Sequence, residues 1–217
     1  GLVGSEMCIR DRYYRMTLWI MSLVAMNSRV HFQGSASAAR SLFELLLDAR
    51  LLEGDSDGTM TAKFHAFPDL DRFRVASQVV EYNDAHSNSS IQDTHQRNLL
   101  QTHGKRQAID ELATEHWGTT NAGNPKRPRH WSGMNVRERA IHLGTKYEEL
   151  YVEAYPLMSW FVHAGSAGYS GLDEDAIESC FGLSHSIAQR CFLEATELTA
   201  ATMHIKEAVE GFNDILD

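Results

Sequence analysis

The chain has 217 residues, of which 43% are hydrophobic, 23% charged and 9% aromatic, and it contains only 4 prolines and 15 glycines. This composition is typical of a globular domain, because it is too apolar for a disordered acidic segment and too charged for a bundle of membrane helices. The 20 Lys and Arg against 29 Asp and Glu give a formal charge of -9, which argues against nucleic-acid binding through the overall charge of the chain.

The cysteine and histidine positions predict neither disulfides nor a metal site. Cys180 and Cys191 lie in one helical pattern and are too far apart along its axis to form a disulfide bond. Together with Cys8 they are expected to be reduced thiols of a cytoplasmic protein. No two of the 11 histidines stand four positions apart and no Cys-x-x-Cys occurs, so we expect no metal and no cofactor.

The N-terminal segment needs separate treatment. The run from Gly4 to Arg15 resembles translated sequencing-adapter sequence, so residues 1–15 are predicted to be a non-native or disordered segment and are left out of the fold prediction. One helical domain is expected over residues 16–217. The apolar stretch from Leu18 to Met26 is too short to span a bilayer, so we interpret it as the remnant of a core helix and expect no membrane segment.

Helical spacing recurs in the first half of the chain, and strand signals are almost absent. Ser35 or Ser37 is placed to cap a helix that ends near Glu53. Pro68 is expected in the first turn of a second helix. A third, more polar helix is predicted from Ser90 to Trp117.

The second half predicts a long loop followed by three further helices. Residues 118–132 are rich in Gly, Asn, Thr and Pro, which is typical of a loop. The following helices are expected from Asn135 to near Gly144, from Thr145 to Ala164, and from about Asp173 past Ile205. The sequence therefore predicts an all-α fold, a single-domain helical bundle of about six to seven helices.

Charge is unevenly distributed along the chain. The region from Leu172 to Asp217 holds ten acidic and two basic residues, whereas the region from Lys126 to Arg139 holds five basic residues and one acidic residue. One interpretation is a solvated acidic helix and a basic loop that packs against its neighbours. The alternative is a small patch for an anionic ligand or for nucleic acid, with these candidate residues: Lys126, Arg127, Arg129 and Arg137.

The helix predicted over residues 38–52 is apolar on nearly all sides, yet it carries Arg40, Glu44 and Asp48 at spacings of four. A helix of this kind is usually central, and a charge inside it must find a partner. Arg40 and Glu44 are therefore predicted to be buried and paired. The alternative is a narrow exposed stripe of weak contacts.

A second polar line runs along the helix predicted over residues 145–164. Tyr155, Ser159 and His163 share one side of it and offer a phenol, a hydroxyl and an imidazole, which suits a hydrogen-bonded network or an acid–base site. These three are the candidate catalytic residues, and Pro156 is expected to kink the helix beside them. Two alternatives stay open, because His163 is also placed to cap the last turn and Ser159 lacks the strained turn of a hydrolytic nucleophile.

The order of these motifs carries a resemblance. Arg40-x-x-x-Glu44, Trp131-Ser132-Gly133, Arg137-Glu138 and Ser159-x-x-x-His163 together resemble an uncharacterised all-helical bacterial family described only as a domain of unknown function. The resemblance covers about Ala38 to Ile205. It implies a helical bundle in which the following residues converge, and it lends no reaction: Arg40, Glu44, Tyr155, Ser159 and His163.

Two classes of function remain open at this stage. The first is a binding or interaction protein whose polar cluster fixes the core or holds a small polar ligand, with Arg137 and Trp131 as further candidates. The second is a defence- or toxin-type nuclease or nucleotide-modifying enzyme, with His163 as general base and Arg40 or Arg137 as phosphate clamp. The Arg-x4–6-His motif of HEPN ribonucleases occurs twice, which chance alone accounts for in a chain with this many arginines and histidines. Self-association through the last helix to form a homodimer is a third, weaker hypothesis, and no other partner is indicated.

Overall fold

The structure is a computed structural model that describes residues 2–102, 104–162 and 173–203. Apart from one 3-10 turn and one isolated bridge between Thr119 and Pro125, the regular structure of these residues is α-helical. The all-α prediction is confirmed, and the described part of the chain holds eight α-helices where six to seven were expected.

The chain divides into two compact units. Unit 1 combines Gly1–Ser56 with Val136–Asp217, and unit 2 is Asp57–Asn135. The expected single domain over residues 16–217 stays a prediction.

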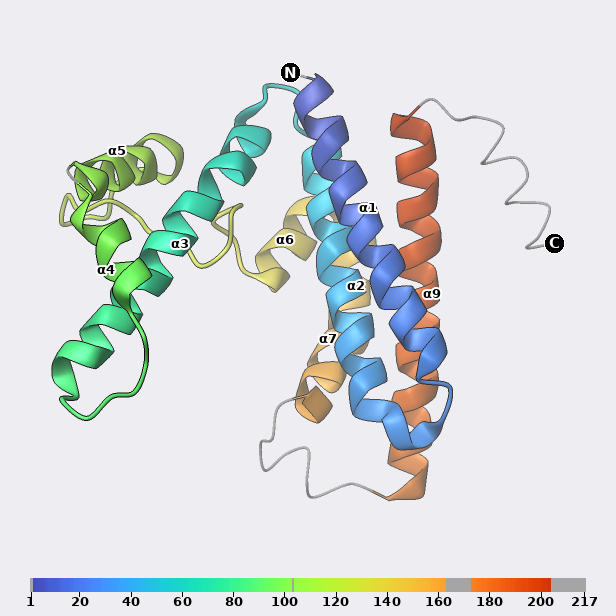
Figure 1. The fold of residues 1–217 in the computed structure, drawn as a ribbon. Coiled ribbons are helices and arrows are strands. Elements are labelled where there is room, and N and C mark those ends of the chain that lie inside the picture. Colours follow the sequence, from blue (N-terminus) through green and yellow to red (C-terminus); the bar gives the residue numbers. More distant parts are fainter. Residues whose placement is uncertain (1, 103, 163–172, 204–217) are drawn as a thin grey trace. The chain divides into compact units, whose positions relative to one another are not determined.

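Unit 1 is a bundle in which the second helix is central. That helix, α2 (Phe32–Glu53), contacts α1 (Leu2–Ala25), α6 (Val136–Leu143), α7 (Thr145–Val162) and α9 (Glu174–Thr202), which surround it (Figure 1). The central position agrees with its apolar pattern, since a helix that is apolar all round is covered on all sides. The elements of unit 1 are α1 (Leu2–Ala25), η1 (Arg29–His31), α2 (Phe32–Glu53), α6 (Val136–Leu143), α7 (Thr145–Val162) and α9 (Glu174–Thr202).

The core of unit 1 lies between α2, α7 and α9. Phe43 and Leu46 of α2 are fully buried, and Ile187 and Cys191 of α9 belong to the same core. The apolar stripe of α9, which could have mediated self-association, therefore packs inside its own unit. The following side chains of this stripe are buried: Cys180, Ile187, Cys191, Ala195 and Leu198.

Unit 2 consists of three helices and the loop that follows them. They are α3 (Thr59–Ala85), α4 (Thr94–Gln101) and α5 (Lys105–Trp117). Their small core contains Leu70 and Phe73 of α3 with Ile109 and Ala113 of α5. Most of the predicted loop over residues 118–132 is irregular, as its composition indicates.

Two helix boundaries in unit 2 differ from prediction. Pro68 lies inside α3 and not in a first turn, because the helix already begins at Thr59, directly after the left-handed Gly58 (φ 79°). The helix predicted from Ser90 to Trp117 is two helices, separated at Gly104, whose φ of 72° a continuous right-handed helix cannot contain.

The N-terminal helix is longer than the predicted remnant over residues 18–26. α1 runs through residues 2–15, and Cys8 and Ile9 are buried within it. The structure thus gives this segment a helical conformation, while its non-native origin stays a prediction. Met16 and Leu23 contribute to the core, as expected for a core helix.

Candidate functional site

A line of charged residues on α2 forms the centre of the candidate site. Arg40, Glu44 and Asp48 stand four residues apart, so they occupy one side of the helix. Arg40 faces α7, Glu44 faces α7 and α6, and Asp48 faces α6 and α1. We call the six residues that bond along this line the α2 network: Arg12, Arg40, Glu44, Asp48, Arg139 and Tyr155.

The first half of the α2 network joins α2 to α7. The Tyr155 hydroxyl donates to Glu44 Oε1 at 2.8 Å and accepts from Arg40 Nη2 at 2.9 Å. Arg40 also lies 3.4 Å from Glu44 Oε1, and its guanidinium carbon is 4.9 Å from the centre of the Tyr155 ring. The Arg40 and Glu44 side chains keep 21% and 33% of their surface exposed, so water reaches this half of the network.

The second half is buried and joins α2 to α6 and α1. Arg139 Nη1 donates to Asp48 Oδ1 at 2.7 Å and to the backbone carbonyl of Glu44 at 3.3 Å. The side chains of Arg139 and Asp48 are only 2% and 6% exposed. Arg12 of α1 approaches the second Asp48 oxygen at 3.6 Å. Buried charges require such partners, because an isolated ion inside a protein is strongly unfavourable.

The phenol of Tyr155 is held in its neutral form. Burial raises its pKa to about 12, and the Glu44 carboxylate that accepts its hydrogen bond acts in the same direction, against the opposing effect of Arg40. Tyr155 therefore remains a proton donor in a hydrogen bond throughout the neutral pH range.

The polar line on α7 is only partly joined to this network. Ser159 Oγ donates to the backbone carbonyl of Tyr155 at 2.8 Å, the bond that a serine inside a helix often makes to its own preceding turn. His163 lies outside the described residues. Of the predicted converging residues, Arg40, Glu44 and Tyr155 are brought together, and Ser159 is adjacent to them through the backbone.

Arg139, and not Arg137, is the arginine that α6 contributes. Arg137 is exposed, whereas Arg139 is among the largest fully buried side chains. Side chains two positions apart on a helix point to nearly opposite sides, so only one of these two arginines can face α2. A signal was present in the sequence, since Val136, Ala140 and Leu143 mark the apolar side of this helix and Arg139 lies on it.

Trp131 belongs to unit 2 and serves in its packing. It is 4% exposed, its carbonyl accepts from the Trp117 indole at 2.8 Å, and the Phe64 ring lies edge-on 5.3 Å away. In the nearby basic loop, Arg127 is paired with Asp110 of α5, while Lys126 and Arg129 are exposed. The Trp-Ser-Gly motif thus has a structural explanation within unit 2.

A second buried carboxylate, Glu194 of α9, was not predicted. It accepts from Arg50 at 2.8 Å, from Lys146 at 2.6 Å and from the Tyr147 hydroxyl. Burial acts to raise the Glu194 pKa, but the hydrogen bonds from Lys146, Tyr147 and Arg50 together bring it below its ordinary value. The signal in the sequence was a lone acid in the apolar stripe between Cys191 and Leu198.

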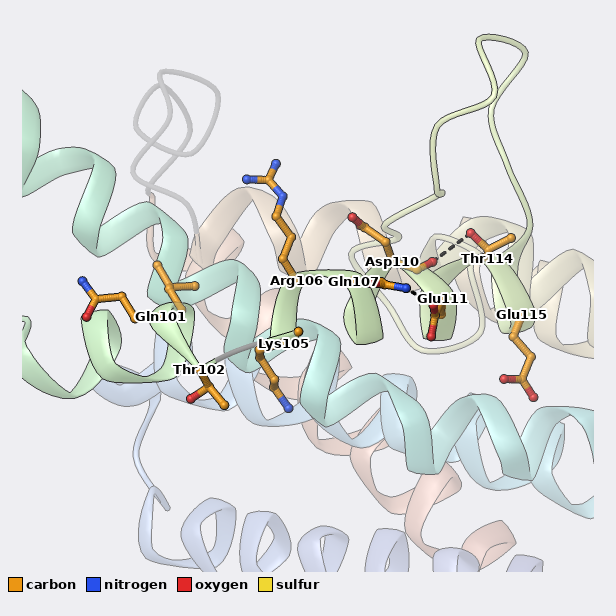
Figure 2. Close-up of a pocket in the computed structure, with 11 residues that line it drawn as sticks. Gln101, Thr102, Lys105, Arg106, Gln107, Asp110, Glu111, Thr114 and Glu115 are labelled. Atoms are coloured by element: carbon orange, nitrogen blue, oxygen red, sulfur yellow. Dashed lines mark hydrogen bonds between the residues drawn. The ribbon is translucent and has the colours of Figure 1, made fainter.

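Unit 2 has a groove of about 990 Å³ along α4 and α5. Figure 2 shows its polar side chains spread along the two helices, with Gln107 donating to Glu111 at 2.8 Å. Both bases and acids line it, so its charge does not define one class of ligand. The charged and polar residues include Gln101, Lys105, Arg106, Asp110, Glu111 and Glu115.

The described residues show neither a metal site nor a membrane-spanning helix. No group of three His, Cys, Asp or Glu side chains there is placed to hold a metal ion. None of the helices in the described ranges has the length and apolar character needed to cross a membrane.

The fold and the network define an all-α protein with a charged line through a helical bundle. The chain belongs to a family of unknown function (DUF5677), whose model matches residues 14–178. No match was found among curated proteins or among solved structures. The resemblance to a helical family of unknown function is confirmed, and the family supplies no reaction.

Proposed function

We propose that the protein is a helical interaction module, in which the α2 network fixes the bundle and a partner binds to an outer surface. The observation that carries this proposal is the hydrogen bonding of Tyr155. Its hydroxyl donates to Glu44 and accepts from Arg40, so both of its polar capacities are used inside the protein. In the buried half, Arg139 donates to Asp48 and to the Glu44 carbonyl.

The alternative of a nuclease or nucleotide-modifying enzyme has less support. A general acid or base works best with a pKa near the working pH, and the Tyr155 pKa of about 12 is far from neutrality. A phosphate clamp at Arg40 would have to displace the bonds to Glu44 and Tyr155. The general base of that alternative, His163, lies outside the described residues, and Arg137 is exposed away from the network.

The cysteines support the expected cytoplasmic location. Cys180 and Cys191 are free thiols, and all three cysteines, Cys8 included, are buried in unit 1. Free thiols of this kind persist in reducing compartments, where disulfides are rare.

Thermal unfolding of network variants tests the proposal. Groups kept for ligand binding or catalysis are often neutral or unfavourable for stability, whereas groups that fix a fold are required by it. Tyr155→Phe removes the hydroxyl with little change of shape, and we expect it to lower the melting temperature. Ser159→Ala is the matched control on the same helix, because its hydroxyl bonds only its own preceding turn among the described contacts. A Tyr155→Phe protein as stable as the wild type or more stable would contradict a structural role for the network.

A further inference from the structure

The outer face of α7 is the surface that α2 and its network leave uncovered. We define it by Glu149, Val152, Glu153, Pro156 and Trp160, which recur at spacings of three and four and so lie on one side of the helix. The buried residues of α7 occupy the opposite side, Tyr147, Leu150, Ala154, Tyr155 and Met158. The side that faces the bundle is thus fully used, and the other side is free to meet a partner.

Two large apolar side chains are exposed on this face. Val152 keeps 66% and Trp160 keeps 53% of its surface in contact with solvent. A single exposed valine needs no explanation, but tryptophan is the residue type most enriched among those that dominate binding at protein interfaces. Trp160 is therefore the natural anchor of an interface on α7.

The backbone of this face offers a hydrogen-bond acceptor. Pro156 lies inside α7 and has no N–H, so the carbonyl of Val152 lacks the donor that the residue four positions later normally supplies. Val152 itself is exposed and lies on the outer face. A donor from a partner, such as a lysine or arginine side chain, is the group that this carbonyl suits.

The charges around the face are predominantly negative. Glu149 is exposed and forms no ion pair with any described residue. Glu153 lies 3.5 Å from Arg190, but both side chains are more than half exposed, so the pair is weak and open to exchange. The nearest base on α7, Lys146, is held by Glu194 at 2.6 Å. The acceptors of the face are thus the Glu149 carboxylate, the Val152 carbonyl and the Glu153 carboxylate in its weak pair with Arg190.

We propose that the outer face of α7 binds a basic amphipathic segment of a partner protein, with Trp160 as the apolar anchor and Glu149 and Glu153 pairing with its lysines or arginines. This proposal rests on the function proposed above, and it adds the surface and the chemistry of the partner. Complementary charge at the rim speeds association and selects the partner, while the apolar anchor provides most of the affinity.

Calorimetric titration of the full chain with a synthetic helical peptide of leucine and lysine, apolar on one side, tests the proposal. The probe is compared with a scrambled peptide of the same composition. We expect the patterned peptide to bind more tightly than the scrambled one, and Trp160→Ala to weaken binding about tenfold or more. Glu149→Lys is expected to weaken binding several-fold and to reduce its salt dependence.

The matched control is Glu178→Lys, which makes the same charge change at an exposed position of α9. It is expected to leave binding unchanged, since that position is not on α7. Equal binding to the wild type and to Trp160→Ala, equal binding of both peptides, or no binding would overturn the proposal. A wild-type dimer in sedimentation that Trp160→Ala dissociates would assign the face to a second copy of the chain, which also overturns it. Melting temperatures separate the two proposals, because Trp160→Ala changes the surface without touching the α2 network and should leave the melting temperature near that of the wild type, whereas Tyr155→Phe is expected to lower it.

Discussion

The buried ion pair between Arg139 and Asp48 provides the sharpest test of the α2 network. Arg139→Met keeps most of the side-chain volume and removes the guanidinium. Removing one partner of a buried pair costs about 3–5 kcal/mol, because the remaining charge stays in the interior. Asp48 would still face Arg12, at 3.6 Å and with a side chain 16% exposed. We therefore expect a loss near the lower end, about 3 kcal/mol of unfolding free energy.

The half of the network around Arg40 and Glu44, which is only partly buried, sets the comparison. Arg40 and Glu44 are 21% and 33% exposed, so water screens their interaction, and Arg40→Ala is expected to cost only about 1 kcal/mol. Had the pair been fully buried, as the sequence predicts, the loss would be several times larger. The burial of the two arginines thus predicts that Arg139→Met loses more stability than Arg40→Ala.

Urea denaturation followed by circular dichroism measures both losses. A double-mutant cycle with Asp48→Leu isolates the pair, and we expect the double variant to recover much of the stability that Arg139→Met loses, since an apolar pair of similar volume replaces an ionic one. Arg137→Met, an exposed change on the same helix, is the control and should stay within about 0.5 kcal/mol of the wild type. If Arg139→Met costs no more than Arg137→Met, or the cycle shows no coupling, the network does not hold α6 to α2.

Three further predictions concern titration and backbone conformation. The folded-state pKa of Tyr155, about 12, lies above its ordinary value of 10.0, so the contribution of this phenol to stability is complete below pH 10 and is lost as the pH rises through 12. An ultraviolet titration of Tyr155→Phe should therefore lack one phenol that ionises late, and a titration identical to that of the wild type would contradict the prediction. The pKa of Glu194 lies below its ordinary value of 4.5, so the contribution of its carboxylate to stability is present above pH 4.5 and is lost on further acidification. Glu194→Gln should therefore flatten the acid side of the plot of unfolding free energy against pH, and parallel plots for the variant and the wild type would contradict the lowered pKa. Gly133→Ala should lower the melting temperature more than Gly123→Ala. Both glycines have a φ near 78°, but only at position 133 would the added Cβ meet the Trp117 side chain, at 3.3 Å. Equal losses of melting temperature would mean that this contact is unimportant.

The sequence was informative where a pattern and a physical requirement coincided. Charges at spacings of four on an otherwise apolar helix must find partners, and Arg40 and Glu44 do meet Tyr155. Helix ends with strong local signals were also predicted close to their observed positions. At Asp173, for example, the side chain accepts from the backbone N–H of Ala176. In these cases the deciding interaction lies within one helix or follows from a single burial constraint.

The sequence was less informative where the answer depends on which side of a helix is covered. Arg137 and Arg139 are equally basic, and only the packing of α6 on α2 makes one exposed and the other buried. Glu194 was missed for the same reason, since its donors come from two other helices, one of which carries Arg50 far away in the chain. Pro68 misled the helix boundary because a proline can lie in a helix interior when the surrounding contacts offset the lost hydrogen bond.

The polar contacts of α2 reach all four helices that surround it, and this distribution explains what they add to an apolar core. Apolar contacts are non-directional and tolerate sliding of one helix along another, whereas a hydrogen-bonded ion pair has a defined geometry. Asp48 connects α2 to α1 and α6, Glu44 connects it to α7, and Arg50 connects it to α9. Each pair therefore sets the register of one helix. For α7 this has a consequence at the surface, because Tyr155, held inside by the network, is followed directly by Pro156 on the outer face. Fixing the phenol therefore also fixes the position of that face, and with it the anchor that we propose at Trp160.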